Sequence, residues 1–399
     1  MGPIRPTPDH ERGAGVNLPD EVDVLVAGFG AGGAAAAIAA QDAGASVAIV
    51  EKTTSGGGNC VYSGGFLFDV DGPHDVDHLD ALCFGKTERT VLEAYARGLR
   101  DVPGFVEALG GTVAPVDFEE LRDTYLPLPL VSVGHQGNTG DTLRLARAAG
   151  ASLWHMSAFF GWLSFVHPGF PAAFTLDVHV PSFICVDGDG RRFADETGWE
   201  VHDRVRALTA YLPRRPNRPR MPGWIIFDEA ARRAGPLHGI VGSPNDYRWS
   251  ADNSAEVAAG WIARGEDIAE LAAASGLDQA VLQSTLGAYA DAVSRRRDDE
   301  FGRAPATLVS LIAPVYAVQM TPAVATASGG PRRDANARVL RPGGAPISGL
   351  FAAGAAGSIW GHLTEHGGGL TDAIVFGMIA GNQCATAAVV AGARPKEMQ

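Results

Sequence analysis

The order of apolar and polar positions predicts an α/β domain near the start of the chain. Residues 23–27 form a short apolar run suited to a buried parallel strand, and residues 46–50 form a second one. The alanine-rich run 34–43 between them favours a helix that ends at Gly44. A glycine turn joins the first strand to this helix. Together, these segments predict a βαβ unit.

The rest of the chain is predicted to contain several helices, a few strands and an inserted domain. The expected helices lie in residues 75–110 (two of them), 142–150, 267–295 and 370–390. A hairpin is expected at 340–344 and an apolar strand at 350–353. The interval 112–137 is rich in proline and irregular, with one short strand at 130–133 as a candidate.

A change in composition along the chain predicts two domains. Residues 151–311 hold most of the tryptophans and long polar loops. We therefore expect a first domain made of 21–150 and 312–392, with 151–311 inserted into it as a second domain. Residues 1–20 are predicted to be a flexible N-terminal tail and residues 393–399 a C-terminal tail. The charge run 294–300 is predicted to be a solvated helix end.

Composition and charge narrow the classes of partner. The formal net charge is -13, which argues against nucleic acid or an anionic membrane as a partner. The four cysteines are widely spaced and show no metal-ligand spacing, so we expect reduced thiols and no metal site. The N-terminus lacks a secretion signal, and the apolar runs carry several glycines. A soluble, cytoplasmic protein without a membrane span is expected.

The first glycine turn has the pattern of a dinucleotide-binding loop. Gly28 permits a tight turn, Gly30 lets a pyrophosphate approach the backbone, and Gly33 allows the helix to pack closely. The N-terminus of the helix that follows this turn would offer free N–H groups to the phosphates. Glu51 ends the second strand, where a carboxylate can accept hydrogen bonds from ribose hydroxyls.

Glycine-rich segments at both ends of the chain extend this pattern. Residues 56–59 and 63–65 follow Glu51 closely, and their small side chains would let a planar ligand approach; a flexible loop is the alternative. Near the C-terminus, residues 367–369 directly precede the long helix. If the planar ligand is a flavin, the positive end of that helix would stabilise its anionic reduced form. A plain helix cap, with Thr371 and Asp372 in the first turn, is the alternative.

Seven stretches, in the same order, resemble the fumarate reductase/succinate dehydrogenase flavoprotein superfamily, which includes the 3-ketosteroid dehydrogenases. They include GGNCVYSGG, NTGDTLRLARAAGA, GDGRRFADE, GWIIFDEAARR and GGGLTDAIVFGMIAG. The resemblance implies a Rossmann-like FAD-binding domain of the glutathione-reductase type with an inserted α+β cap domain. It also implies bound FAD and hydride transfer between flavin N5 and a carbon beside a carbonyl or carboxylate.

The same resemblance assigns candidate FAD-binding residues. They are Gly28, Gly30, Ala31, Gly33, Glu51, Lys52, Gly58, Asn59, Ser63, Gly64, Gly65, Asp141, Gly354, Ala355, Gly368, Gly369 and Leu370. For Asp141, an ordinary helix N-cap is the alternative role. No histidine lies between Thr53 and Gly65, so we expect FAD to be bound without a covalent link.

Five residues are candidates for catalysis. Arg232 matches the arginine that follows the family's F-D-D motif, and its alternative is a surface helix arginine. Arg192 and Glu196 match an R-F-x-x-E segment, or form a structural ion pair between cap and core. Glu365 and His366 would act as acid or base beside the flavin, or are exposed loop residues.

Departures from the family narrow the substrate. Ala355 replaces a glutamate of the fumarate reductases, the stretch 325–328 lacks their histidine, and their substrate-binding arginine falls near Thr364. A dicarboxylate needs paired charged donors, so these losses argue against it. Residues 358–362 resemble the ketosteroid dehydrogenase pattern, although the tyrosine that follows it there is absent. We therefore expect a small, fairly apolar, steroid-like or polycyclic ketone substrate and a separate, unidentified electron donor or acceptor.

The first domain lacks a segment that the family has, and this supports a second hypothesis for the function. The family places a β-meander and a strand ending in A-T-G-G where this chain has only 112–137. A redox-inactive flavin-fold binding protein or pseudoenzyme is therefore the second hypothesis. An NAD(P)-dependent dehydrogenase is a third one, and the C-terminal glycine segment argues against it.

Overall fold

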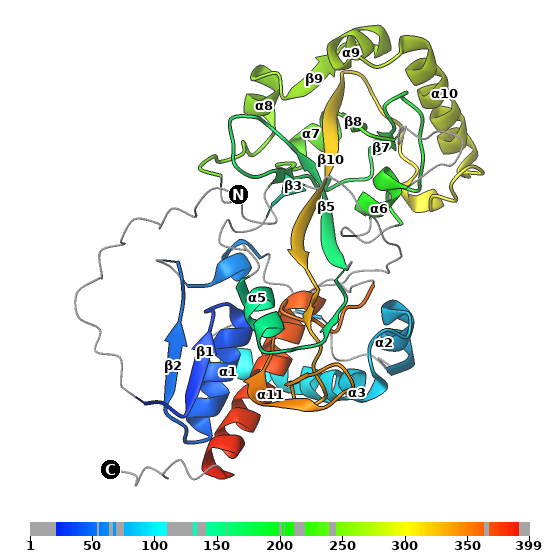
Figure 1. Ribbon diagram of the computed structural model, residues 1–399. Helices are drawn as coiled ribbons and strands as arrows, with labels where there is room; N and C mark the ends of the chain where they lie inside the picture. Colours follow the sequence, from blue (N-terminus) through cyan, green and yellow to red (C-terminus); the bar gives the residue numbers. More distant parts are fainter. Residues whose placement is uncertain are drawn as a thin grey trace, which may run out of the picture.

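A computed structural model shows an α/β body joined to a second body that is built on a mixed sheet (Figure 1). The described residues are 21–53, 56–63, 67–68, 76–109, 131–133, 141–156, 158–198, 202, 204–210, 220–238, 245–362 and 367–390. Strands β5 (Phe159–Phe165) and β10 (Val315–Ala327) run side by side between the two bodies.

The predicted βαβ unit is present at the start of the first domain. Strand β1 (Val24–Ala27) pairs in parallel with β2 (Val47–Val50), and helix α1 (Ala31–Asp42) connects them. The Gly28 N–H donates to the Val50 carbonyl at 2.8 Å, which ties the glycine turn to the second strand. This places the turn and Glu51 at the same end of the sheet.

Helix α11 (Gly368–Val390) packs against α1 through glycines. A Cβ on Gly377 would lie 2.5 Å from the Gly32 carbonyl oxygen and 2.7 Å from the Cβ of Ala35. A Cβ on Gly32 would lie 3.2 Å from the backbone nitrogen of Gly354. Because no side chain separates the helices here, their backbones approach closely, and the start of α1 lies beside the second and third turns of α11.

Short helices and hairpins complete the first domain. The helices are α2 (Val76–Cys83), α3 (Arg89–Gly98), α4 (Val102–Ala108) and α5 (Asp141–Ala148), with the 3-10 turns η1 (Gly58–Tyr62) and η2 (Leu99–Asp101). The strand pairs are β4 (Leu153–Trp154) with β11 (Gly330–Pro331), and β12 (Arg338–Leu340) with β13 (Pro346–Phe351). The second pair is the hairpin predicted at 340–344. Leu92 and Tyr95 of α3 pack with Trp360 and Phe376 in one buried core.

The cap contains a seven-stranded sheet, counted over the described residues. Its central path runs β6-β5-β10-β8-β7, and β3 and β9 also pair with β10. The strands not yet bounded are β3 (Val131–Ser132), β6 (Phe174–Thr175), β7 (Phe183–Val186), β8 (Gly223–Asp228) and β9 (Ile262–Gly265). The cap helices are α6 (Arg204–Thr209), α7 (Glu229–Arg233), α8 (Ser254–Ala258), α9 (Ile268–Ser275) and α10 (Gln279–Arg295), with the turn η3 (Pro305–Thr307). Gly276, at φ +77°, divides the predicted run 267–295 into α9 and α10.

Strand β10 moves the predicted domain boundary. The sequence places residues from 312 onward in the first domain, yet β10 pairs with β5, β8 and β9 of the cap. Its side chains alternate between two cap cores, with Tyr316 and Val318 in one and Val315 and Ala317 in the other. The cap therefore extends to the end of β10 at Ala327.

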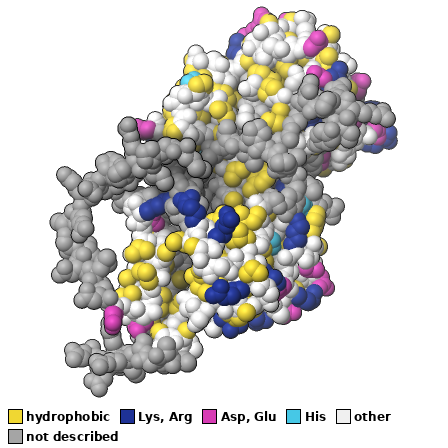
Figure 2. Space-filling model, viewed as in Figure 1, with side chains coloured by type: hydrophobic (Ala, Val, Ile, Leu, Met, Phe, Trp, Pro, Cys, Tyr) yellow, Lys and Arg dark blue, Asp and Glu magenta, His cyan; other side chains and the backbone are white. Residues whose placement is uncertain are grey.

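The sheet of the first domain is small. Over the residues that the structure describes, β1 and β2 pair only with each other. Leu25 is 64 % exposed and Val50 42 % exposed, and Figure 2 shows apolar surface over these strands. The candidate strand at 130–133 is present as β3, but it pairs with β10 of the cap. The other residues of 112–137 lie outside the described ranges.

Candidate cofactor site

The glycine turn after β1 has the geometry that a phosphate-binding loop needs. Gly28 adopts a φ of +100°, and a Cβ on Gly33 would collide with the Gly28 carbonyl oxygen. Glycine is therefore required at both positions. A Cβ on Gly30 would meet only the Gly57 carbonyl oxygen, at 3.9 Å, so the backbone of Gly30 faces open space. A ligand can approach the loop and the start of α1 at this point.

Glu51 is held as a carboxylate at the end of β2. Its Oε2 accepts the Phe29 N–H at 2.9 Å, and its Oε1 accepts the N–H and the hydroxyl of Thr53 at 3.0 and 2.8 Å. These hydrogen bonds, the one from Phe29 first, lower the pKa of Glu51 to about 2. An ionised carboxylate has about four acceptor positions, so it retains capacity for a ribose hydroxyl.

The second glycine segment connects the loop to the cap. The Gly57 N–H donates to the Phe29 carbonyl at 2.6 Å, and Gly58 adopts a φ of +51° at the start of η1. The Asn59 Nδ2 donates to the Ala325 carbonyl of β10 at 3.0 Å. Ser63 is exposed at the end of this segment. The segment therefore spans from the first helix to the cap strand.

The C-terminal glycines lie against aromatic side chains. A Cβ on Gly368 would lie 2.8 Å from Cε2 of Trp360, and one on Gly369 would lie 3.2 Å from Cζ of Phe160. The Trp360 Nε1 is buried and has no hydrogen-bond partner among the described residues. The first two residues of α11 therefore carry no side chain and lie against two rings, and the Trp360 ring has a donor without a partner among the described residues.

The start of α1 and the second turn of α11 come together at Gly354. Gly354, at φ +69°, lies between them, because its Cβ would lie 3.5 Å from the Cβ of Ala373 while Gly32 approaches its nitrogen. Neither α1 nor α11 has an acidic residue in its first turn, so no carboxylate there offsets the positive end of either helix. One elongated anionic ligand can therefore contact both. These residues fit FAD: the loop before α1 would hold its phosphates and the start of α11 its flavin ring.

The sequence assigns no role to His362, although residues 358–362 resemble the ketosteroid dehydrogenase pattern. This histidine is buried, and its ring stacks on Phe84 at a centroid distance of 4.0 Å. Its carbonyl accepts the Arg206 Nη2 of cap helix α6 at 2.7 Å. Burial, followed by the charges of Arg206 and Lys86, lowers the pKa of His362 to about 4. His362 is therefore neutral near pH 7, at the junction of cap and core.

Arg232 is engaged within the cap. It donates to Glu229 at 2.7 and 2.8 Å, and to the carboxylate and carbonyl of Asp252 at 3.0 and 2.5 Å. Its helix, α7, lies in the upper body of Figure 1. These contacts support a structural role for Arg232, instead of a catalytic one.

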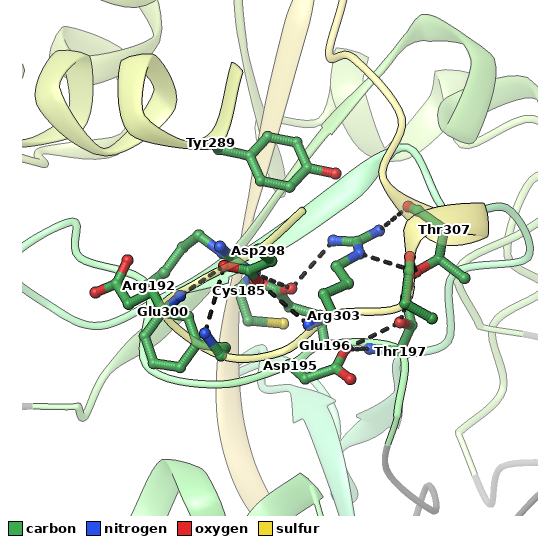
Figure 3. A network of polar contacts seen from close by, with 12 residues as sticks. Cys185, Arg192, Asp195, Glu196, Thr197, Tyr289, Asp298, Glu300, Arg303 and Thr307 are labelled. Atoms are coloured by element: carbon green, nitrogen blue, oxygen red, sulfur yellow. Dashed lines mark hydrogen bonds and ion pairs between the residues drawn. The ribbon is translucent and has the colours of Figure 1, made fainter. Parts of the chain in front are cut away.

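Arg192 and Glu196 form a buried ion pair, but both belong to the cap (Figure 3). Glu196 also accepts the Arg303 Nη1 at 3.0 Å, and Arg192 donates to Asp298 at 2.9 Å. The pair therefore joins parts of the cap to one another, instead of the cap to the core. Asp298 is buried, although it lies in the charge run 294–300 that the sequence predicts to be a solvated helix end.

The remaining candidates are only partly described. Lys52 and Ala355 are exposed, and Leu370 is half-buried against the first-domain core. Asp141 begins α5, although its side chain is not described. Gly64, Gly65, Glu365 and His366 lie outside the described residues.

The described residues show neither a metal-binding cluster nor a membrane-spanning helix. No group of three or more His, Cys, Asp or Glu side chains in these ranges is arranged to hold a metal ion. None of the helices described is long and apolar enough to cross a membrane.

Comparisons with known proteins agree with this geometry. A family model described as FAD binding domain matches residues 23–89 and 100–370. The chain is 30% identical over 253 residues to a probable fumarate reductase (Ifc3) of Shewanella frigidimarina, covering 62% of this chain and 38% of that one. It is 26% identical over 285 residues to a 3-oxosteroid 1-dehydrogenase of Mycobacterium tuberculosis, covering 66% and 49%. The chain thus spans less than half of either relative.

Solved structures share the fold. The crystal structure of 3-ketosteroid Δ1-dehydrogenase from Sterolibacterium denitrificans aligns with a TM-score of 0.75 at 20% identity, covering 92% of this chain and 99% of that one. The open conformation of a flavocytochrome c3 fumarate reductase aligns with a TM-score of 0.66 at 21% identity, covering 93% and 79%. Because the family model matches most of this chain, the chain belongs to the FAD-binding domain family of flavoproteins.

Proposed function

We propose that this protein binds FAD without a covalent link and moves a hydride between flavin N5 and a carbon next to a ketone. The substrate would be a small, fairly apolar molecule, such as a steroid-like or polycyclic one, and a separate electron donor or acceptor would complete the cycle. The observation that carries the proposal is the packing of the start of α1 on the second turn of α11, with Gly354 between them.

Each end of the site would hold one part of the cofactor. Gly28, Gly30 and Gly33 would hold the pyrophosphate, and Glu51 would accept from the ribose. Gly368 and the residues beside it would hold the flavin ring, with the positive end of α11 toward its C2 carbonyl. Bound FAD would supply the hydride acceptor or donor at N5.

The surroundings of the α11 start favour an apolar substrate. Phe160 packs on Gly369, and Phe160 and Trp162 of β5 both contact the ring of His202 edge-on, at 5.5 and 5.0 Å. Such rings exclude water and contact apolar substrate surface. The dehydrogenase matched above acts, by its name, on a 3-oxosteroid, which agrees with this substrate class.

The visible spectrum of the purified protein tests the proposal directly. We expect a flavin spectrum, either as isolated or after reconstitution with FAD, that a reductant bleaches and that an enone or 1,4-diene-3-ketosteroid restores. Fumarate is the matched control and should not restore it. A protein that takes up no FAD under any of these conditions would contradict the proposal.

The two-stranded sheet of the first domain favours a second candidate, a redox-inactive FAD-binding protein. Such a protein would bind FAD but would not return its electrons to any ketone or enone. Rapid reoxidation of the reduced flavin by a substrate, monitored without oxygen, would exclude this candidate.

A further inference from the structure

A buried ion pair lies next to the start of α11. The Arg333 Nη2 donates to the Asp372 Oδ1 at 2.6 Å, and neither side chain is exposed to solvent (0 % for both). Asp372 is the fifth residue of α11, and Arg333 follows β11. The Arg333 guanidinium also lies 4.0 Å from the centroid of the Phe376 ring, one turn further along α11. Arg333 is therefore fixed against the helix by two contacts.

A buried pair of this kind needs a reason, because apolar residues of similar size often fill such a place at lower cost in stability. The Asp372 carboxylate lies about one helical turn from Gly368. Without a counter-charge, a carboxylate there would oppose the positive potential that the start of α11 presents to a ligand. Burial lowers the pKa of Arg333 and raises the pKa of Asp372, while each partner favours the charged form of the other.

We propose that Arg333 is a positioning residue that acts through Asp372. By neutralising this carboxylate, it preserves the positive potential at the start of α11 and thereby holds the reduction potential of the bound flavin higher than it would otherwise be. This inference rests on the proposed function, since it requires FAD with its ring at α11.

The two partners have opposite expected effects, which separates an electrostatic role from a structural one. Asp372→Asn leaves the Arg333 charge without its counter-ion, so an anionic reduced flavin becomes more stable and the reduction potential rises. Arg333→Met leaves the Asp372 carboxylate without its counter-ion and therefore lowers the potential, and an unchanged potential in this variant would overturn the inference. The double variant removes both charges and should return the potential to the wild-type value.

The experiment is a potentiometric titration of FAD-loaded wild type, Asp372→Asn, Arg333→Met and the double variant. We expect Asp372→Asn to shift the two-electron equilibrium toward reduced flavin at least tenfold, or about 30 mV. The double variant should stay within twofold of the wild type. The inference is overturned if Asp372→Asn stays within twofold of the wild type, or if both single variants shift in the same direction.

A matched control comes from the same segment. Arg338 and Asp334 form an ion pair at 2.6 Å, with 43 % and 18 % exposure, and the Arg338→Met/Asp334→Asn double variant should leave the potential unchanged. Asp372→Ser replaces Asp372→Asn if the latter does not fold, as judged by circular dichroism. A wild type that binds no FAD contradicts the proposed function itself, whereas normal binding with an unmoved potential contradicts only the role of Arg333.

Discussion

At the scale of single residues, the glycines of the first loop differ in what they make possible. Gly33 is required by the protein, because its helix packs against the Gly28 carbonyl. Gly30 meets little of the protein, so its lack of a side chain serves whatever lies above the loop. One sequence pattern thus combines a folding requirement with a binding requirement, and the two can be separated by experiment.

We expect Gly33→Ala to lower the melting temperature of the FAD-free protein, because the added methyl overpacks the loop at a cost of about 1–3 kcal/mol. Gly30→Ala should leave that melting temperature unchanged but weaken FAD binding. Thermal denaturation and FAD titration of both variants check this. Equal melting temperatures for the two variants would show that the loop relaxes around a methyl at Gly33.

His362 should make stability depend on pH. Its pKa is lowered from 6.5 to about 4, so between these values the folded protein binds fewer protons than the unfolded chain. Stability therefore falls as the pH decreases from 6.5 toward 4. The pKa values of His155 and His238 are also lowered by burial, so His362→Gln should flatten this decline without abolishing it. Urea denaturation at pH values across the window measures the slope, and an unchanged slope would contradict the prediction.

At the scale of elements, local patterns predicted well what depends on neighbours in sequence. The βαβ unit, the hairpin at 340–344 and the long C-terminal helix are all present. The place of β10 could not be predicted, because alternating apolar residues fit any sheet and its partner strands lie far away in sequence. The same holds for Asp372, whose partner Arg333 lies 39 residues earlier.

The contact between α1 and α11 can be tested by its glycines. Gly377→Val should lower both stability and FAD affinity, because a side chain there would push the Gly32 carbonyl and Ala35 away and separate the start of α1 from α11. The cost of overpacking is about 1–3 kcal/mol. Ala387→Val is the control, since it adds two methyl groups at an exposed position of the same helix. Unchanged FAD affinity in a destabilised Gly377→Val variant would show that the helix contact does not position the cofactor.

At the scale of the whole molecule, the charged network of Figure 3 supports the cap as a unit. Arg303 donates to the carbonyls of Phe183 and Pro181 at 2.8 and 2.5 Å, and to Glu196. These contacts join β7 and the loop before it to the segment that follows α10. The R-F-x-x-E pattern pointed to two of these residues, but their partners more than 100 residues away carry no signal in the local sequence.

Glu196→Gln should therefore destabilise the cap by about 3–5 kcal/mol, because two buried guanidinium groups lose their shared carboxylate. FAD affinity of the folded protein should not change. Thermal denaturation and FAD titration check both parts, with Asp189→Asn as control, since its pair with Arg191 is about half exposed (47 % and 49 %). A stable Glu196→Gln protein that binds FAD but has lost turnover would instead support a catalytic role.

The course of β10 has a consequence for dissecting the molecule. A polypeptide cut at residues 151–311 would contain β5, β8 and β9 but not the strand to which all three are hydrogen-bonded. Its edges would be open and two of its cores would each lack one wall. We therefore expect residues 151–311 not to fold by themselves, and a fragment that also includes β10 to be the smallest one that keeps this sheet together.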